Sequence, residues 1–283
     1  CEGMCFPTIP RRKGGVKLPG LSLPFLSGGC IQDRIETPFF QRPTMSNDAH
    51  LAALLADIRA TFDVDFDPLD IDGQTLHLLA VRNMPRHLDS LLARGAIHNP
   101  LRDLPLWAKV WPASFLLGRL LRHFDPEGRT LLEIGAGCGV TGLVAARYGF
   151  SHITISDIVP EALQFARANV LRNGLEGRVD VARVDVAAPG RDERFAGGVD
   201  IIAASEILYL DELHRPLLKF CSRHLAKGGK AVFCTDTARA KPRFAKNAAK
   251  YFKTTERRIG ITSQDGEGQK QGRLYDILVL ERA

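Results

Sequence analysis

The sequence lacks the patterns that would indicate a metal site, a disulfide framework or a membrane span. It has no CxxC pair and no histidine close to a cysteine at zinc-finger spacing. No apolar run approaches the roughly 20 residues that a membrane helix requires. We therefore expect a soluble protein without a bound metal, in the reducing environment of the cytoplasm. The six cysteines occupy positions 1, 5, 30, 138, 221 and 234.

The sequence also has little net charge. The formal charge is +6 over 283 residues, and the first 44 residues carry half of it. Such a small excess does not indicate a nucleic-acid partner. The remaining composition, 45% hydrophobic and 25% charged, is typical of an ordinary globular protein with one large α/β domain.

The first 44 residues differ from the rest because they are rich in proline and glycine and lack helical or strand periodicity. We interpret residues 1–44 as a disordered leader or a non-native extension. A capped amphipathic pattern begins at Met45, which we take as the native start. The alternative is a cleaved targeting sequence, but prolines interrupt its short apolar stretch around Leu18–Leu26.

From Thr130 the chain alternates between strand and helix patterns, which predicts a mostly parallel sheet with helices on both faces. The ending differs, because two apolar-alternating segments flank a polar turn and predict a closing antiparallel hairpin. The fold class is therefore α/β, a Rossmann-like doubly wound sheet of seven strands. The expected strands cover residues 130–135, 152–157, 179–186, 199–208, 230–236, 254–261 and 273–281.

Two pieces precede this core. We expect residues 45–106 to form an N-terminal helix and a small β-containing extension, the latter made of DGQTLHLLAV and the stretch after it. We assign residues 107–283 to the main domain, whose first element is an amphipathic helix that starts at Pro112.

The segment LLEIGAGCGVTG is the most informative part of the sequence. An expected strand ends at Ile134, and Gly135, Gly137 and Gly139 then allow a tight turn and a close backbone approach before the next helix. This context of strand, glycine loop and helix predicts a nucleotide-type ligand. The loop also contains a literal GxGxxG starting at Gly137, so these residues alone leave a dinucleotide open.

The loop from Glu133 to Gly139 reads E-x-G-x-G-x-G and resembles motif I of the seven-strand S-adenosylmethionine methyltransferases. That resemblance implies S-adenosylmethionine as cofactor, held by Glu133 and the three glycines. Asp157 ends the next strand, where an acid can accept hydrogen bonds from ribose hydroxyls. The resemblance places Asp185 where the family commonly binds the adenine amino group, although Asp185 could also be a solvated strand-end acid. The closing hairpin favours a methyltransferase over a nicotinamide-dependent oxidoreductase.

Residues 205–209 follow another expected strand and should lie beside the cofactor loop, because ligands of doubly wound sheets bind at the carboxyl ends of strands. The segment ASEILYLDEL resembles the D-x-x-Y signature of methyltransferase family 16, which includes many protein lysine methyltransferases, with Glu206 in place of the usual Asp. The resemblance implies that Glu206 and Tyr209 face a substrate lysine. It also implies that Ser205 lies at the cofactor and that Trp111, in a Trp-Pro segment, packs by the cofactor or by the substrate channel.

A lysine amine, with a free pKa of about 10.4, must lose a proton before it attacks a methyl group. Glu206 could attract the ammonium and Tyr209 could contribute its ring or hydroxyl. Structural alternatives remain open: Glu206 could cap the next helix, and Tyr209 and Trp111 could be packing residues. We expect a protein substrate that bears a lysine, with no membrane and no nucleic acid as partner. A small-molecule or RNA methyltransferase, an oxidoreductase and a non-catalytic adapter are the alternatives.

Overall fold

The computed structural model describes residues 46–99, 103–188, 190, 192–239, 241–264 and 270–282. The expected leader over residues 1–44 and the expected start at Met45 lie outside the described residues. The middle of the polar turn in the C-terminal hairpin, residues 265–269, also lies outside them.

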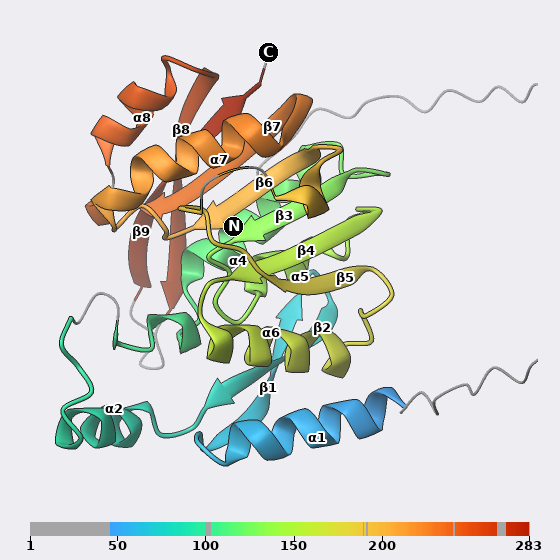
Figure 1. Cartoon of the computed structure of the whole chain (residues 1–283), viewed down its shortest axis with the longest axis vertical. Coiled ribbons are helices and arrows are strands. Elements are labelled where there is room, and N and C mark those ends of the chain that lie inside the picture. The colour runs from blue at the N-terminus through green and yellow to red at the C-terminus, as the bar shows by residue number, and fades with distance from the viewer. Residues whose placement is uncertain are drawn as a thin grey trace, which may run out of the picture. The chain divides into compact units, whose positions relative to one another are not determined.

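Seven strands form one sheet in the order β5-β4-β3-β6-β7-β9-β8 (Figure 1). The strands from β3 to β7 pair in parallel, and β9 runs antiparallel to both β7 and β8. The predicted fold class, a doubly wound sheet with an antiparallel hairpin, is confirmed. The strands are β3 (Thr130–Ile134), β4 (His152–Asp157), β5 (Val179–Arg183), β6 (Val199–Ser205), β7 (Leu225–Asp236), β8 (Lys253–Gln264) and β9 (Lys270–Glu281).

Two clusters of buried side chains lie on the two faces of this sheet. Leu131 of β3 belongs to one cluster and Leu132 to the other, because successive side chains of a strand point to opposite faces. Helices α4, α5 and α6 contribute to the cluster of Leu131, whereas α7 and α8 contribute to that of Leu132. In Figure 1, α7 lies in front of β6 and β7. The helices are α4 (Pro112–Leu120), α5 (Val140–Ala145), α6 (Pro160–Arg172), α7 (His214–His224) and α8 (Pro242–Ala248).

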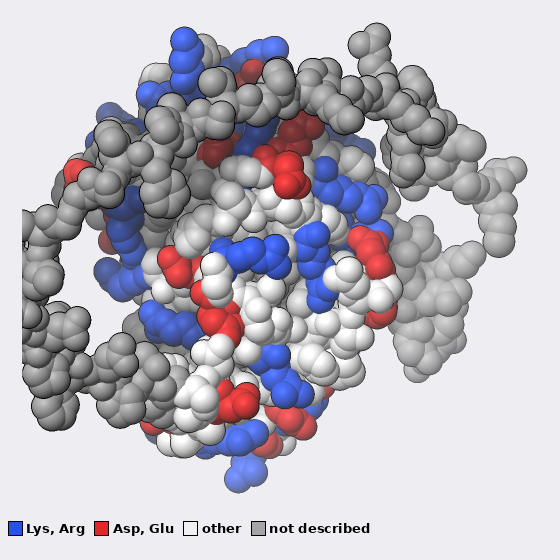
Figure 2. Space-filling model, turned by 90° about the vertical axis from the view of Figure 1, so that its right-hand side faces the viewer, with Lys and Arg blue, Asp and Glu red and all other residues white. Residues whose placement is uncertain are grey.

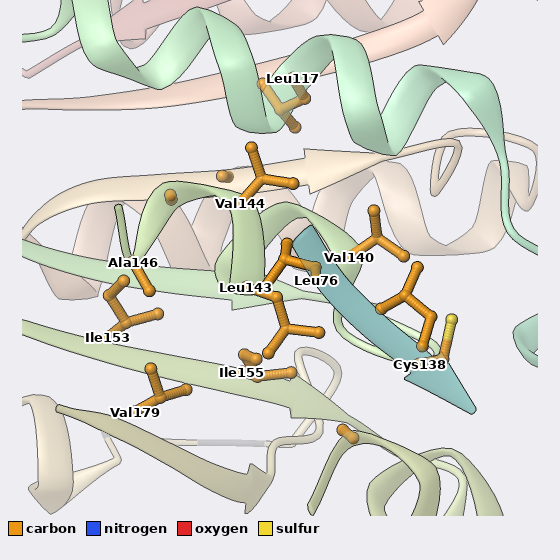
Figure 3. Close-up of a cluster of buried hydrophobic side chains, with 14 of the residues drawn as sticks. Leu76, Leu117, Cys138, Val140, Leu143, Val144, Ala146, Ile153, Ile155 and Val179 are labelled. Atoms are coloured by element: carbon orange, nitrogen blue, oxygen red, sulfur yellow. The ribbon is translucent and has the colours of Figure 1, made fainter. Parts of the chain in front are cut away.

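The core beneath α4 and α5 anchors the glycine loop that leads into α5. Figure 3 shows Leu117 of α4 above Val144 of α5, with Leu143 pointing toward Ile155 of β4. All four side chains are fully buried. Burial of each contributes roughly 1.5–3 kcal/mol. The start of α5 is therefore held rigidly against the sheet.

The N-terminal extension consists of α1 (Asn47–Arg59), a two-stranded hairpin and α2 (Met84–Ala93). The hairpin strands, β1 (Val64–Ile71) and β2 (Gln74–Val81), are joined by Asp72 and Gly73, both with positive φ, as in a tight two-residue turn. The structure places a strand, β2, in the expected β extension at DGQTLHLLAV, and a helix, α2, in the stretch that follows it. Asn83 caps that helix by accepting from the backbone N–H of Arg86 at 3.0 Å.

Two asparagines, one in α6 and one at its C-cap, attach the hairpin to the main domain. The side chain of Asn173 accepts from the N–H of His77 at 2.9 Å and donates to its carbonyl at 2.8 Å. One turn earlier, fully buried Asn169 accepts from the N–H of Leu79 at 2.7 Å. Asn169 also donates to the carbonyl of Cys138 in the glycine loop at 2.9 Å. The extension is thus linked through α6 to the loop that the sequence marks as a ligand site.

Candidate active site

A cavity of about 330 Å³ opens at the carboxyl ends of β3 and β6. From β3 the chain continues outward through β4 and β5, whereas β6 and β7 extend the sheet in the other direction. The crevice where the strand order reverses is the usual ligand site of open α/β sheets. Eight of the ten residues assigned from the sequence line it: Trp111, Gly135, Gly137, Asp157, Asp185, Ser205, Glu206 and Tyr209.

The glycine loop forms one wall of the cavity. Gly135 and Gly137 have φ values of 60° and 55°, which side chains rarely adopt. A Cβ atom at Gly137 would lie 2.6 Å from the carbonyl oxygen of Trp107. Glycine is therefore needed at position 137 to let the loop pass under the segment before α4. Gly139 does not line the cavity and instead forms the N-cap of α5 with a φ of 84°.

Glu133 lies beneath the loop and does not line the cavity. Its carboxylate is fully buried and accepts from the backbone N–H of Gly142 at 2.7 Å. Burial raises the pKa of Glu133 to about 7, and the hydrogen bond from Gly142 partly opposes this rise. The structure therefore gives Glu133 contacts with α5, where the sequence predicted contact with the cofactor.

Asp157 connects the end of β4 to the glycine loop. Its Oδ2 accepts from the N–H of Gly137 at 2.8 Å, and its Oδ1 accepts from the N–H groups of Ile158 and Val159 at 2.7 and 3.0 Å. A carboxylate has about four acceptor positions. These bonds use three of them and fix the orientation of the group at the cavity wall.

Asp185 and Ser205 lie at the ends of β5 and β6 and both line the cavity. The Oδ1 of Asp185 accepts from the N–H of Ala187 at 2.9 Å, so one carboxylate oxygen closes a local turn. Both residues lie at the cavity because the carboxyl ends of parallel strands meet at one edge of the sheet.

Glu206 sits at the cavity in an unusual backbone conformation. Its φ of 52° is left-handed, which costs energy for a residue with a side chain. Its Oε1 accepts from the N–H of Asp236 at 3.0 Å and from Nη2 of Arg239 at 2.8 Å, while Oε2 accepts from Nε of Arg239 at 2.9 Å. These contacts bind the end of β6 to the segment after β7. The alternative that Glu206 caps the next helix does not match these partners.

Trp111 packs close to two cations at the cavity. The ammonium of Lys109 lies 4.4 Å and the guanidinium carbon of Arg239 5.3 Å from ring centroids of the indole. Both distances are in the range of cation–π attraction. The indole N–H donates to the carbonyl of Leu106 at 3.0 Å, which fixes the plane of the ring.

Tyr209 lines the same cavity from the segment that follows β6. Burial, and then the negative charges of Asp157 and Glu212, raise the pKa of Tyr209 above its usual value of 10. The hydroxyl is therefore a neutral group at physiological pH and can both donate and accept a hydrogen bond.

The sequence analysis missed Arg239 and Trp107. Arg239 lies three residues after the end of β7, where the carboxyl-end rule could have identified it. Trp107, in the short 3-10 helix η1 (Leu106–Ala108), packs its ring edge-on against Phe62 and Phe165 at centroid distances of 5.7 and 4.9 Å. Its carbonyl then abuts Gly137. Trp107 thus connects the extension, α6 and the glycine loop.

Residues 99–258, more than half of the chain, match the family model described as lysine methyltransferase. Every residue that lines the cavity falls within this range. The chain belongs to this lysine methyltransferase family. Family membership confirms the resemblance inferred from the glycine loop, the Glu206 segment and the Trp-Pro segment.

Among the curated proteins similar to this chain, two are named as lysine methyltransferases and one is named as a ribosomal RNA methyltransferase. Protein N-lysine methyltransferase METTL21A of Danio rerio is 36% identical over 46% of this chain and 61% of its own length. EEF1A lysine methyltransferase 3 of Mus musculus is 33% identical over 47% and 56%. Ribosomal RNA small subunit methyltransferase C of Pseudomonas entomophila is 34% identical over 50% and 44%. The chain thus spans 44–61% of the length of these relatives.

None of the helices among the described residues has the length and apolar character needed to cross a membrane. The same part of the chain holds no group of three or more His, Cys, Asp or Glu side chains suited to a metal ion.

Proposed function

We propose that this protein is an S-adenosylmethionine-dependent methyltransferase that modifies a lysine side chain of a protein substrate. The observation that carries the proposal is the cavity at the switch point of β3 and β6, formed wholly by residues that the lysine methyltransferase family model matches. Three buried free cysteines, Cys138, Cys221 and Cys234, agree with a reducing compartment such as the cytoplasm.

The cavity residues fit such a cofactor by their chemistry. Asp157 has one acceptor position left beside Gly137, which suits a ribose hydroxyl, and the second oxygen of Asp185 suits an amino group. Gly135 and Gly137 add no side chains to the wall. The cofactor supplies a methyl group activated by an adjacent sulfonium, so the protein has mainly to position the nucleophile.

The substrate amine is proposed to enter beside Tyr209 and Trp111. The neutral hydroxyl of Tyr209 can accept a hydrogen bond from the amine, and the cations of Lys109 and Arg239 beside the indole of Trp111 favour the uncharged form of that amine. Partial burial favours the neutral form of a lysine, which is the form that attacks. Orientation and deprotonation are thus both served by side chains at the cavity.

We assign Glu206 a positioning role in place of the direct amine contact inferred from the sequence. Its carboxylate already accepts three hydrogen bonds, two of them from Arg239. The pair neutralises charge at the cavity rim and fixes the segment that carries Tyr209. Positioning of this kind can supply much of the rate of a displacement at carbon.

An RNA methyltransferase is the second candidate, because a relative named for ribosomal RNA aligns with half of the chain. The family match favours protein over RNA. A small-molecule methyltransferase, a nicotinamide-dependent oxidoreductase and a non-catalytic adapter are less well supported, since no observation specifically favours them.

Methyl transfer from radiolabelled S-adenosylmethionine into cell lysate tests the proposal. The expected result is label that protease removes, nuclease does not, and mass spectrometry locates on lysine. Label that nuclease removes would establish RNA as the substrate. A parallel thermal-shift comparison separates cofactors, because only a ligand that binds the folded state raises the melting temperature. Stabilisation by NAD and not by S-adenosylmethionine would favour the oxidoreductase.

A further inference from the structure

A second and larger cavity lies next to the candidate active site, between α7 and α8. Its volume is about 720 Å³. Two short segments contribute to both cavities. Tyr209, Leu210, Leu213 and Arg239 line the candidate active site, whereas Asp211, His214, Lys241 and Pro242 line the second cavity, so the two cavities lie close together. In Figure 1, α8 lies at the upper left and α7 crosses in front of β6 and β7. We call this second cavity the α7–α8 groove.

The α7–α8 groove is lined by cations from both helices. On α7, Arg215, Lys219 and Arg223 recur every four residues and therefore share one face of the helix. Lys241, Arg243 and Lys250 come from α8 and its two ends. Asp211 is the one carboxylate among the described lining residues, and it pairs with Lys241 at 3.1 Å.

This arrangement is electrostatically unfavourable in the isolated protein. Like charges at i and i+4 on a helix repel, and no described carboxylate lies within ion-pair distance of Arg215, Lys219 or Arg243. An ordinary solvated helix face intersperses charges of both signs. Figure 2, which shows the right-hand side of Figure 1, has such a face, with blue and red side chains interspersed among white ones. The groove therefore differs from the surface on that side.

We propose that the α7–α8 groove binds an acidic segment of the protein substrate, a few residues along the chain from the target lysine. This inference rests on the proposed function and names the substrate class for the same site. The groove begins at Asp211 and Lys241, directly beside Tyr209 and Arg239 of the candidate active site. A substrate whose lysine enters the active site therefore passes the cations of the groove.

The composition of the groove favours a peptide over a nucleic acid. Leu218, Pro242 and Tyr251 lie among the cations, and Tyr251 is 72% exposed. Apolar and aromatic side chains between cations suit a peptide that mixes acidic with apolar residues. Single-stranded RNA is usually bound by a succession of stacking aromatic side chains, and Tyr251 is the one aromatic residue other than a histidine among the described lining residues.

The test uses the full chain and two fluorescein-labelled 16-residue peptides, without cofactor. One peptide carries a single lysine followed by glutamates and a leucine, and the other has glutamine in place of each glutamate. Binding is measured by fluorescence anisotropy. The glutamate peptide should bind at least about tenfold more tightly, and its affinity should fall as salt is raised.

The variants compare cations inside and outside the groove. The double variant Lys219→Glu, Arg243→Glu should weaken binding of the glutamate peptide by about tenfold or more. Lys246→Glu is the matched control, because Lys246 is exposed on the same helix as Arg243 but does not line the groove. It should change the affinity less than about twofold.

Equal binding of the two peptides, or equal losses in the double variant and in Lys246→Glu, would overturn the proposal. Tighter binding of a single-stranded RNA oligonucleotide, weakened by the same double variant, would replace the acidic peptide with RNA. Calorimetry with S-adenosylmethionine and the radiolabel assay are run separately. Failure of those measurements would count against the proposed function, whereas the peptide measurements concern the groove alone.

Discussion

The guanidinium of Arg239 holds the carboxylate of Glu206 with two parallel hydrogen bonds, of 2.9 Å from Nε and 2.8 Å from Nη2. The side chain of Glu206 is only 8% exposed, and its carboxylate accepts a third hydrogen bond from the N–H of Asp236. The hydrogen bonds to Glu206 also raise the pKa of Arg239, so the guanidinium stays charged. A nearly buried carboxylate paired with an arginine, beside a left-handed backbone, indicates that the end of β6 is held in one geometry.

Glu206→Gln should separate this positioning role from cofactor binding. Glutamine keeps the size of the side chain and an acceptor for Asp236 but loses the charge that Arg239 requires. We expect kcat to fall at least about tenfold, because a charge-assisted hydrogen bond contributes roughly 1.5–3 kcal/mol. The Kd for S-adenosylmethionine, measured by calorimetry, should stay within about twofold. An unchanged kcat would remove Glu206 from the mechanism.

Arg239→Gln, alone and combined with Glu206→Gln, distinguishes positioning from blocking. If the pair positions Tyr209, each single variant lowers kcat with little change in KM. The kcat of the double variant is then no lower than that of the less active single variant. Arg239→Lys should restore part of the loss. If Arg239 instead competes with the substrate ammonium for Glu206, removal of Arg239 will lower KM or raise kcat.

Tyr209→Phe should lower kcat by about tenfold, the equivalent of one neutral hydrogen bond. The variant keeps the ring and its packing, so the cofactor affinity should not change. Because burial raises the pKa of Tyr209 above its usual value of 10, ionisation of the phenol should have little effect on the rate of the wild-type protein below about pH 9. Steady-state kinetics between pH 7 and pH 9.5 would check both statements.

Tyr148→Phe is the matched control for Tyr209→Phe. The hydroxyl of Tyr148 donates to Asp72 in the N-terminal hairpin at 3.1 Å and does not line the cavity. Its loss should leave kcat unchanged. A similar loss of kcat in both variants would show that removal of a tyrosine hydroxyl acts through stability and not through the amine.

The position of the site could be predicted from the sequence because it depends on local rules. Apolar runs identify the strands, and the residues at their carboxyl ends meet at one edge of a parallel sheet. Gly135, Asp157 and Ser205 follow from this rule alone. The same rule places Arg239 at this edge, but it does not predict that Arg239 pairs with Glu206, because the pairing depends on how β6 and β7 align. Their register shifts between Val199 and Ile201, and no local pattern reports such a shift.

The N-terminal hairpin shows a similar limit. The segment VDFDPLDI of β1 alternates apolar and acidic residues, but Pro68 interrupts the pattern. A proline is tolerated in this two-stranded sheet because an edge strand can lack a ladder hydrogen bond. Which neighbour β2 would pair with was therefore not evident. The contacts of Asn169 and Asn173 with β2 join segments about 90 residues apart and lay equally beyond local reasoning.

Glu133 should make the stability of the protein fall as pH rises. The folded-state pKa is about 7, against an ordinary value of 4.5. Between these values the unfolded chain has released a proton that the folded protein still binds, so the free energy of unfolding decreases with pH. Above pH 7 both states are ionised and the full penalty, about 3 kcal/mol, applies.

Urea denaturation of the wild type and of Glu133→Gln at pH 5, 6, 7 and 8 measures this effect. Glutamine does not titrate and can still accept from Gly142. The variant should therefore gain free energy of unfolding relative to the wild type as pH rises, by up to about 3 kcal/mol. If the free energy of unfolding changes equally with pH in the two proteins, burial does not destabilise the carboxylate of Glu133.

Asn169→Ala and Asn173→Ala should differ in their effect on the cofactor site. Both variants remove bonds to the backbone of β2, and each should lower the free energy of unfolding, by about 2 kcal/mol or more for fully buried Asn169. Both asparagines bind β2.

Only Asn169 also donates to the carbonyl of Cys138 in the glycine loop. Substitution of Asn169 leaves that carbonyl without this donor and releases the loop beside Gly137 and Gly139. We therefore expect Asn169→Ala to weaken the binding of S-adenosylmethionine about tenfold, and Asn173→Ala less than about twofold. Calorimetry at a temperature where both variants are folded makes the comparison, and equal affinities in the two variants would mean that the loop is held without Asn169.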